Sequence, residues 1–179
     1  MRIIGGIFKS RIFKPRKDFT ARPTTDFARE NLFNILANRY NFDNKSVLDL
    51  FGGTGSISCE FVSRGCLSTT VVELDRANCK FICSVIEKLG VMSSVKVINS
   101  DVFRFIGKTS EQYNIIFADP PYELKRLAEI PDLILKSNLL CEEGLLILEH
   151  GKANDFSLHP CFCELRTYGS VHFSFFEQK

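Results

Sequence analysis

The chain of 179 residues has the length of one domain, and its 45% hydrophobic content and near-average charge argue against a disordered polypeptide. Its longest apolar runs have only the length of strands, which argues against a membrane span, and the first residues lack the apolar core of an export signal. Seven cysteines without such a signal argue against a disulfide framework. We therefore expect a cytoplasmic protein.

The net charge of +2 conceals an asymmetry along the chain. Residues 1–29 contain eight Lys or Arg against two Asp, whereas the remainder is mildly acidic. A basic arm is typical of a protein that binds a polyanion, and it is equally consistent with an edge hairpin whose cations prevent aggregation. The candidate nucleic-acid contacts are Arg2, Lys9, Arg11, Lys14, Arg16, Lys17 and Arg22.

In chain order, the first expected element is a hairpin or pair of short strands over residues 2–14, followed by a polar loop. Thr24 or Thr25 then caps a helix with an apolar stripe. From there strands alternate with helices. The helices after the first and second strands end near residues 64 and 89, and the helix after the fourth strand runs from about residue 124 to 135. We expect strands at 46–51, 69–74, 95–98, 113–118 and 145–149, and a closing hairpin of 164–168 and 171–176.

This alternation predicts an α/β fold with a parallel sheet and crossover helices on both faces. In such sheets the ligand lies beyond the carboxyl ends of the strands, at the point where the strand order reverses. We divide the chain into a basic arm, residues 1–23, and one α/β domain, residues 24–179.

A glycine turn follows the first strand, at residues 49–55, where glycines let a ligand approach the backbone closely. A dinucleotide fingerprint would need glycine where Ser58 stands, and the Asp49 carboxylate would repel a pyrophosphate. A ligand with an ammonium group would be attracted instead. S-adenosylmethionine carries an ammonium and a sulfonium and no phosphate. The turn alone is weak evidence, because glycine turns also serve plain helix–strand packing.

Acidic residues also end the next two strands. Glu73 lies 20 residues after Gly53, where a carboxylate can accept both hydroxyls of a ribose. Asp101 follows the third strand, where it could accept from an adenine amino group. Each acid alone is better explained as a solvated residue or a helix cap. Together with Asp49, the three acids at successive strand ends argue against coincidence.

The most specific pattern is Asp119-Pro120-Pro121-Tyr122, directly after the fourth strand. Two prolines cannot continue the ladder and fix a rigid turn. That turn would hold the Asp119 carboxylate and the Pro120 carbonyl as paired acceptors, with the Tyr122 ring beside them. The amino group of a nucleic-acid base is a poor nucleophile, and two acceptors on its N–H bonds would aim its lone pair at an incoming methyl group. A plain structural turn is the alternative.

The chain resembles the RsmD-type 16S ribosomal RNA guanine-N2 methyltransferases in four segments: Arg22-Pro-Thr-Thr-Asp, Arg29-Glu-Asn-Leu-Phe-Asn-Ile-Leu, Asp49-Leu-Phe-Gly-Gly-Thr-Gly and Asp119-Pro-Pro-Tyr. The resemblance covers nearly the whole chain. It implies a Rossmann-like class I methyltransferase fold with a seven-stranded, mostly parallel sheet and S-adenosylmethionine as cofactor. It also implies methylation of a guanine N2 in 16S rRNA, within an assembled or assembling small ribosomal subunit.

The same resemblance assigns roles to residues. It gives the methionine part of the cofactor to the glycine turn, the ribose to Glu73, the adenine to Asp101, and the target base to the turn after the fourth strand. The candidate cofactor residues are Asp49, Phe51, Gly52, Gly53, Thr54, Gly55, Glu73, Leu74, Asp101 and Val102. The candidate catalytic residues are Asp119, Pro120, Pro121 and Tyr122. Gly53 stands where the family usually has Ala, which leaves the cofactor expectation unchanged.

Several other functions were weighed against this one. Protein glutamine methyltransferases typically carry Asn where Asp119 stands, and the Pro160-Cys161 pair of a cytosine-C5 enzyme would lie outside the expected cleft. His159, Cys161 and Cys163 are too few for a zinc site, so we predict no metal. Two alternatives stay open: an adenine-N6 methyltransferase, which shares the Asp-Pro-Pro-Tyr turn, and a catalytically silent RNA-binding assembly factor.

Overall fold

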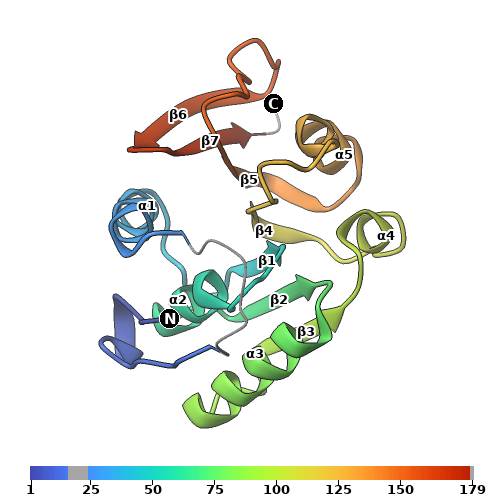
Figure 1. Ribbon diagram of the computed structural model, residues 1–179. Helices are drawn as coiled ribbons and strands as arrows, with labels where there is room; N and C mark the ends of the chain where they lie inside the picture. Colours follow the sequence, from blue (N-terminus) through green and yellow to red (C-terminus); the bar gives the residue numbers. More distant parts are fainter. Residues whose placement is uncertain (16–23, 178–179) are drawn as a thin grey trace.

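The computed structural model describes residues 1–15 and 24–177, and its centre is a seven-stranded sheet with helices on both faces (Figure 1). The strand order is β3-β2-β1-β4-β5-β7-β6. The strands are β1 (Ser46–Leu50), β2 (Ser68–Glu73), β3 (Val95–Asn99), β4 (Tyr113–Ala118), β5 (Leu140–His150), β6 (Phe162–Tyr168) and β7 (Val171–Glu177). Strands β1 to β5 pair in parallel, and β7 is antiparallel to both β5 and β6.

Alternate residues of the central strands face opposite layers of helices, as the pleat of a strand requires. On one face, Val47 and Phe117 pack with α1 (Asp26–Arg39) and α2 (Ser56–Ser63). The helix α3 (Arg76–Leu89) covers β2 and β3 on the same side. On the other face, Leu48 and Ile116 pack with α4 (Val102–Ile106) and α5 (Ile130–Lys136). The expected fold class is thus confirmed, including the seven strands.

Three details of the expected elements differ from the structure. The helix expected from about residue 124 begins later, as the 3-10 turn η2 (Leu127–Glu129) followed by α5. Pro131 lies in the first turn of α5, where its missing N–H has no partner to lose. The short α4 was not expected, because it has too few residues for a helical stripe. Strand β5 also begins five residues earlier than expected, at Leu140, and its pairing with β4 shifts register between Tyr113 and Ile115.

The N-terminal arm is a closed loop on the outside of the sheet. Its two limbs meet at one antiparallel bridge, Arg2 with Ile12, and the 3-10 turn η1 (Gly6–Phe8) lies between them. Ile3 is 1% exposed and packs with Val85 and Leu89 of α3. The predicted contacts Arg16, Lys17 and Arg22 lie outside the described residues. None of the helices in the described ranges is long and apolar enough to cross a bilayer.

Candidate active site

Backbone hydrogen bonds bring the turns after β1 and β4 to the same edge of the sheet. The amide of Asp119 donates to the carbonyl of Leu50 at 3.3 Å, and the amide of Gly52 donates to the carbonyl of Val72 at 3.0 Å. Strand β1 lies between β2 and β4, so the strand order reverses here. This is the place where open α/β sheets bind their ligands. The predicted cofactor turn and the predicted catalytic turn are therefore neighbours in space.

The glycine turn leaves the sheet through three residues in the left-handed region. Phe51 has φ 65°, Gly53 has φ 55° and Gly55 has φ 73°. For Phe51 this conformation is strained, and such strain is common where a backbone is shaped for a ligand. A Cβ on Gly52 would lie 2.3 Å from Cγ1 of Val71, so no larger residue fits that position. The sequence of the turn thus prescribes its close contact with β2.

Asp49 lies beneath the turn and is 2% exposed. Its Oδ2 accepts from the backbone amide of Ser58 at 3.2 Å and from the Ser58 hydroxyl at 2.5 Å. Burial raises the pKa of Asp49 to about 7, although the two bonds from Ser58 act in the opposite direction. In the sequence, Ser58 served only as an argument against a dinucleotide site. In the structure, its two hydrogen bonds fix the position of the Asp49 carboxyl group. Asp49 can act on a ligand ammonium through its charge.

Glu73, at the end of β2, is bonded to the backbone of the glycine turn. Its Oε2 accepts from the amide of Gly53 at 2.8 Å, and its Oε1 accepts from the amide of Asp75 at 2.7 Å. The next residue, Leu74, exposes 68% of its surface although it is a large apolar side chain. An acid fixed at the rim and an uncovered apolar side chain beside it suit a ribose and the flat face of a base, respectively.

The side chains of Asp101 and Val102 make contacts within the fold. The Asp101 carboxylate accepts from the amide of Arg104 at 2.9 Å and so caps α4, which is the plain alternative weighed for it from the sequence. The Val102 side chain is buried in the core. Both residues lie at the end of β3 beside Glu73, whose carbonyl accepts from the amide of Ser100 at 3.1 Å.

The turn after β4 makes contacts that extend to two other elements. The Tyr122 hydroxyl donates to Oε1 of Glu149 on β5 at 3.1 Å. The Thr24 hydroxyl, just before α1, lies 2.8 Å from Oε2 of Glu149 and 3.3 Å from Oδ2 of Asp119. Burial, with the negative charges of Glu149 and Asp49, raises the pKa of Asp119 well above its usual range. A Cβ on Gly151 would lie 3.0 Å from the Tyr122 ring, so this ring packs against bare backbone.

Sequence reasoning missed three residues of this site: Ser58, Thr24 and Glu149. Ser58 was considered only as a departure from the dinucleotide fingerprint, and its spacing from Asp49 was the available signal. Thr24 lies in the Pro-Thr-Thr segment, where it was considered only as a helix cap; the cap is Thr25, which accepts from the amide of Ala28. Glu149 is a fifth acid near the end of a strand, and that pattern could have identified it.

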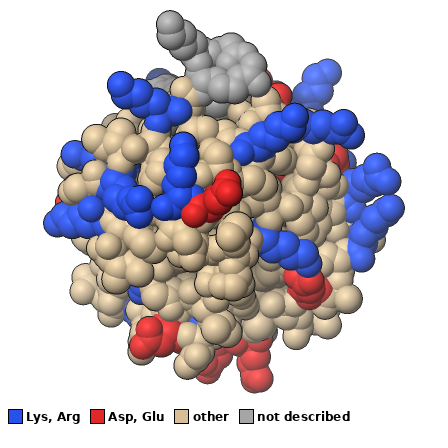
Figure 2. Space-filling model, turned by 90° about the horizontal axis from the view of Figure 1, so that it is seen from below, with Lys and Arg blue, Asp and Glu red and all other residues tan. Residues whose placement is uncertain are grey.

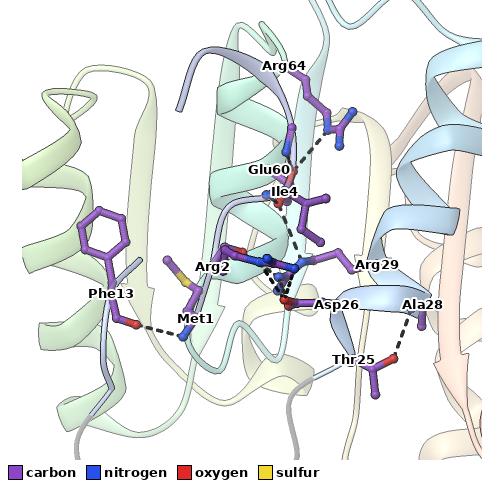
Figure 3. Close-up of polar contacts among 11 residues, drawn as sticks. Met1, Arg2, Ile4, Phe13, Thr25, Asp26, Ala28, Arg29, Glu60 and Arg64 are labelled. Carbon is purple, nitrogen blue, oxygen red and sulfur yellow. Dashed lines mark hydrogen bonds and ion pairs between the residues drawn. The ribbon is translucent and has the colours of Figure 1, made fainter. Parts of the chain in front are cut away.

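The arm is joined to the domain by a buried cluster of charges (Figure 3). Glu60 of α2 is fully buried, and its carboxylate accepts from the amides of Ile4 and Gly5 and pairs with Arg64 at 3.3 Å. Arg29 of α1 is 2% exposed and donates to the carbonyl of Arg2 at 2.6 Å. The Arg29-Glu segment that resembles the known family therefore contributes its arginine to the junction of the arm and the domain.

The described cations of the arm are not equivalent. Arg2 pairs with Asp26 at 2.9 Å, and the Arg11 guanidinium lies over the rings of Phe8 and Phe13 and donates to the carbonyl of Lys88. Lys9 and Lys14 are exposed. Figure 2 shows the face that carries the arm and α3: Lys and Arg dominate its upper half and flanks, and acids gather mainly at its lower edge.

Among the described residues, no three His, Cys, Asp or Glu side chains gather in an arrangement that could hold a metal ion. Between His159 and Cys161, a ring nitrogen of His159 accepts a hydrogen bond from the backbone amide of Cys161 at 3.1 Å.

The sheet order, the glycine turn at its reversal point and the acids at its strand ends are those of the Rossmann-like class I methyltransferases. The model of the family described as "Conserved hypothetical protein 95" matches residues 1–177, and the chain belongs to this family. Ribosomal RNA small subunit methyltransferase D from Escherichia coli K12 is 32% identical over 89% of this chain and 79% of that protein. The resemblance to the RsmD-type enzymes is thus confirmed.

Two further comparisons agree. "Putative rRNA methyltransferase YlbH" from Bacillus subtilis 168 is 32% identical over 85% of this chain and 83% of that protein. A solved structure described as a putative methyltransferase, yhhF, from Escherichia coli covers 100% of this chain and 98% of its own, with a TM-score of 0.86 and 28% identity.

Proposed function

We propose that the chain transfers a methyl group from S-adenosylmethionine to the exocyclic N2 amino group of a guanine in the 16S rRNA of the small ribosomal subunit. The observation that carries this proposal is the position of the Asp119 turn. It lies beside the glycine turn and is bonded to the end of β1 at Leu50. The names of the relatives support an rRNA methyltransferase. Such a substrate would place the enzyme in the cytoplasm.

The residues at the sheet edge fit S-adenosylmethionine better than a dinucleotide. Asp49 offers a negative charge to an ammonium group and repels a pyrophosphate. The backbone of residues 51–55 can approach the methionine part closely. Glu73 and Leu74 suit the ribose and the adenine. Asp101 and Val102 lie next to them, at the end of β3. When bound, S-adenosylmethionine supplies a methyl group already activated by its sulfonium.

The work of the protein is therefore to position and shape the acceptor nitrogen. The Asp119 carboxyl and the Pro120 carbonyl would accept the two N–H bonds of the amino group and aim its lone pair at the methyl carbon. Pro121 holds the turn rigid, and the Tyr122 ring would stack on the base, which contributes on the order of 1–3 kcal/mol. After the new N–C bond forms, the nitrogen releases one proton, for which Asp119 is the adjacent acceptor.

The arm would contact phosphates of the RNA. Residues 1–15 contain four Lys or Arg and no Asp or Glu. The exposed Lys9 and Lys14 are the best placed of them, because Arg2 and Arg11 are also engaged in the fold. Arg16, Lys17 and Arg22 complete the proposed contacts. With a small arm and no separate recognition domain, the enzyme would read folded RNA by its shape, within an assembled or assembling subunit.

The test is methylation with radiolabelled S-adenosylmethionine of two substrates, naked 16S rRNA and small-subunit particles that lack the modification. We expect N2-methylguanine in the digested product by mass spectrometry, and none with Asp119→Ala. A methyl group on adenine N6 would move the enzyme to the first alternative. Binding of the particles without any transfer of label would favour the silent assembly factor.

A further inference from the structure

The first turn of α1 carries an aromatic side chain that the core does not use. The buried residues Ala28, Leu32 and Leu36 recur every four residues and form the stripe that packs on the sheet. Phe27 lies just before this stripe and leaves 66% of its surface exposed. Within α1, which the structure describes throughout, it is the one large apolar side chain left exposed. Single exposed apolar side chains are common on protein surfaces, so its support and its location decide whether it has a role.

A second aromatic ring supports Phe27. The Tyr168 ring, at the end of β6, meets it edge to face, with the ring centroids 6.0 Å apart and the ring planes at 83°. Tyr168 is partly buried and packs against Phe173 of β7, with a centroid distance of 6.1 Å. Figure 1 shows the hairpin of β6 and β7 beside α1. Phe27 is thus a ring held by the sheet, with most of its surface open to a ligand.

The strand register places this aromatic pair at the edge of the sheet that carries the candidate active site. Strand β6 runs in the same direction as β5, because both are antiparallel to β7. His172 of β7 pairs with His150 at the end of β5. The preceding residue of β7, Val171, pairs with Tyr168. Tyr168 therefore lies at the same level as the carboxyl end of β5.

The start of α1 lies close to the Asp119 turn. Phe27 follows Thr24 by three positions, and the Thr24 hydroxyl lies 3.3 Å from Oδ2 of Asp119. The Cα atoms of Phe27 and Thr24 are therefore at most about 11 Å apart. Lys152, just after β5, adds an exposed cation at this edge of the sheet. An RNA strand whose base occupies the Asp119 turn would thus bring its next nucleotides to Phe27.

The chemistry of the proposed reaction gives an exposed ring a use here. A base that is to be modified has to leave the stack of its neighbours, which costs stacking energy. An aromatic ring at the mouth of the site can replace part of this stacking for an adjacent base, since every base has a π-face. One ring also suits a base better than it suits a protein, because a stable protein interface buries about 1,000 Å² or more.

We propose that Phe27 is a stacking platform for a base that neighbours the target guanine, and that Tyr168 is the positioning residue that holds its ring. The ligand is a nucleotide in a single-stranded or opened segment of the RNA. The platform accepts any base, because stacking uses the face of the base and not its hydrogen-bonding edge. This proposal rests on the proposed function, since the platform is useful only if a base enters the Asp119 turn.

The first test compares substitutions at Phe27. Phe27→Ala should weaken the affinity for unmodified small-subunit particles by roughly 5–150-fold, and Phe27→Trp, which keeps a π-face, should stay within about threefold. Phe27→Leu keeps the apolar character without a ring and should resemble Phe27→Ala. Calorimetry should find unchanged affinity for S-adenosylhomocysteine in all three variants.

The control is Met92→Ala. Met92 is 65% exposed and lies before β3, at the opposite edge of the sheet, so its removal should leave the affinity for the particles unchanged. Unchanged affinity in Phe27→Ala or in Phe27→Leu would overturn the platform, because the ring would then contribute nothing.

Tyr168 is tested by separating KM from kcat. Tyr168→Ala should raise the KM for RNA and leave kcat unchanged, because stacking on a neighbouring base is the same in the ground state and the transition state. Tyr168→Phe keeps the edge-to-face ring contact and should restore the KM. A fall in kcat with unchanged KM in Tyr168→Ala would contradict the positioning role.

The last test locates the contact. A benzophenone amino acid in place of Phe27 is irradiated in the complex with unmodified small-subunit particles, and the cross-linked nucleotide is mapped by reverse transcription. We expect a neighbour of the guanine that the unaltered enzyme methylates. Cross-links to a ribosomal protein, or to RNA far from that guanine, would overturn the platform and leave the proposed function standing. If the unaltered enzyme transfers no methyl group to RNA, the proposed function fails and the platform fails with it.

Discussion

Two buried groups of acids in this protein have opposite surroundings. At the junction of arm and domain, Glu60 is enclosed by two backbone amides and by the guanidinium groups of Arg29 and Arg64. At the sheet edge, Asp119 and Glu149 face one another through a threonine hydroxyl, and Asp49 adds a further negative charge. Both groups bury carboxyl groups, but the charges described around Glu60 are positive, whereas those described around Asp119 are negative.

This difference distinguishes a cluster that stabilises the fold, around Glu60, from a cluster that can take part in catalysis, around Asp119. A buried carboxylate that has cations and amides around it stays ionised, and removing any partner leaves the others unsatisfied. A buried carboxyl group with negative neighbours, such as Asp119 beside Glu149 and Asp49, holds its proton more tightly and can change its charge when a ligand arrives. We therefore expect substitutions at the arm junction to change stability, and substitutions at the sheet edge to change turnover.

The largest expected effect is on turnover. Asp119→Ala removes an acceptor of the target amino group, so the rate of methyl transfer should fall by about 10²–10⁴-fold or below detection. Asp119→Asn should be nearly as damaging, because the amide offers one acceptor and can present donors. Single-turnover assays measure the rate, and calorimetry should find affinity for S-adenosylmethionine within a few fold. Full activity in Asp119→Ala would overturn the mechanism.

The matching substitution at the arm junction is Glu60→Ala. It removes the buried carboxylate beside Arg64 and Arg29, although Arg29 keeps Asp26, and it removes the acceptor of two backbone amides. The free energy of unfolding should therefore fall by about 3–5 kcal/mol. Urea denaturation measures this change. The control is Glu87→Ala on the exposed side of α3, which should change stability by no more than about 0.5 kcal/mol. A loss below about 1 kcal/mol at Glu60 would show that the cations there are dispensable.

Tyr122 separates stacking from hydrogen bonding at the sheet edge. Tyr122→Ala removes the ring and should weaken transition-state binding by about 1–3 kcal/mol. Tyr122→Phe keeps the ring and loses the hydroxyl that bonds to Glu149, a bond worth about 0.5–1.5 kcal/mol, so substantial activity should remain. The ratio kcat/KM for RNA measures both. Equal losses in the two variants would assign the contribution to the hydroxyl.

The charge of Asp49 at the sheet edge can be tested by changing the pH. Because its pKa is raised to about 7, its charged fraction grows as the pH rises from 6 to 8. Attraction for the ammonium of S-adenosylhomocysteine should grow with it, so binding should tighten by up to roughly tenfold over this range. Calorimetry at several pH values should show the trend, and Asp49→Asn should flatten it. Weaker binding at pH 8 than at pH 6 would contradict this sign.

The smallest effect concerns the surface of the arm. Lys9→Ala with Lys14→Ala should reduce the slope of log affinity for RNA against log salt by roughly 0.7–0.9 for each phosphate that is no longer neutralised. Lys136→Ala, an exposed lysine on α5 at the opposite face, is the control and should leave the slope unchanged. An unchanged slope in the double variant would leave the arm as an edge structure that does not bind RNA.

Much of the fold follows from local patterns. A short continuous run of apolar residues placed β4 at residues 113–118, because a strand buried on both faces is apolar along its length and can be recognised without its partners. The start of α5 was misjudged because a proline can end a helix or occupy its first turn, and the choice depends on packing against the sheet. The five-residue α4 is too short to carry a periodic signal.

The sequence by itself determined the candidate cofactor turn and the Asp119 turn, because each is a short contiguous motif whose backbone geometry is prescribed by Gly or Pro. The tertiary structure alone decided which acids act together. Thr24 and Glu149 are 125 residues apart, and Thr24 and Asp119 are 95 apart. They meet because β5 pairs with β4 and α1 begins above their carboxyl ends. The proximity of the two acids is a property of strand order, which no local pattern encodes.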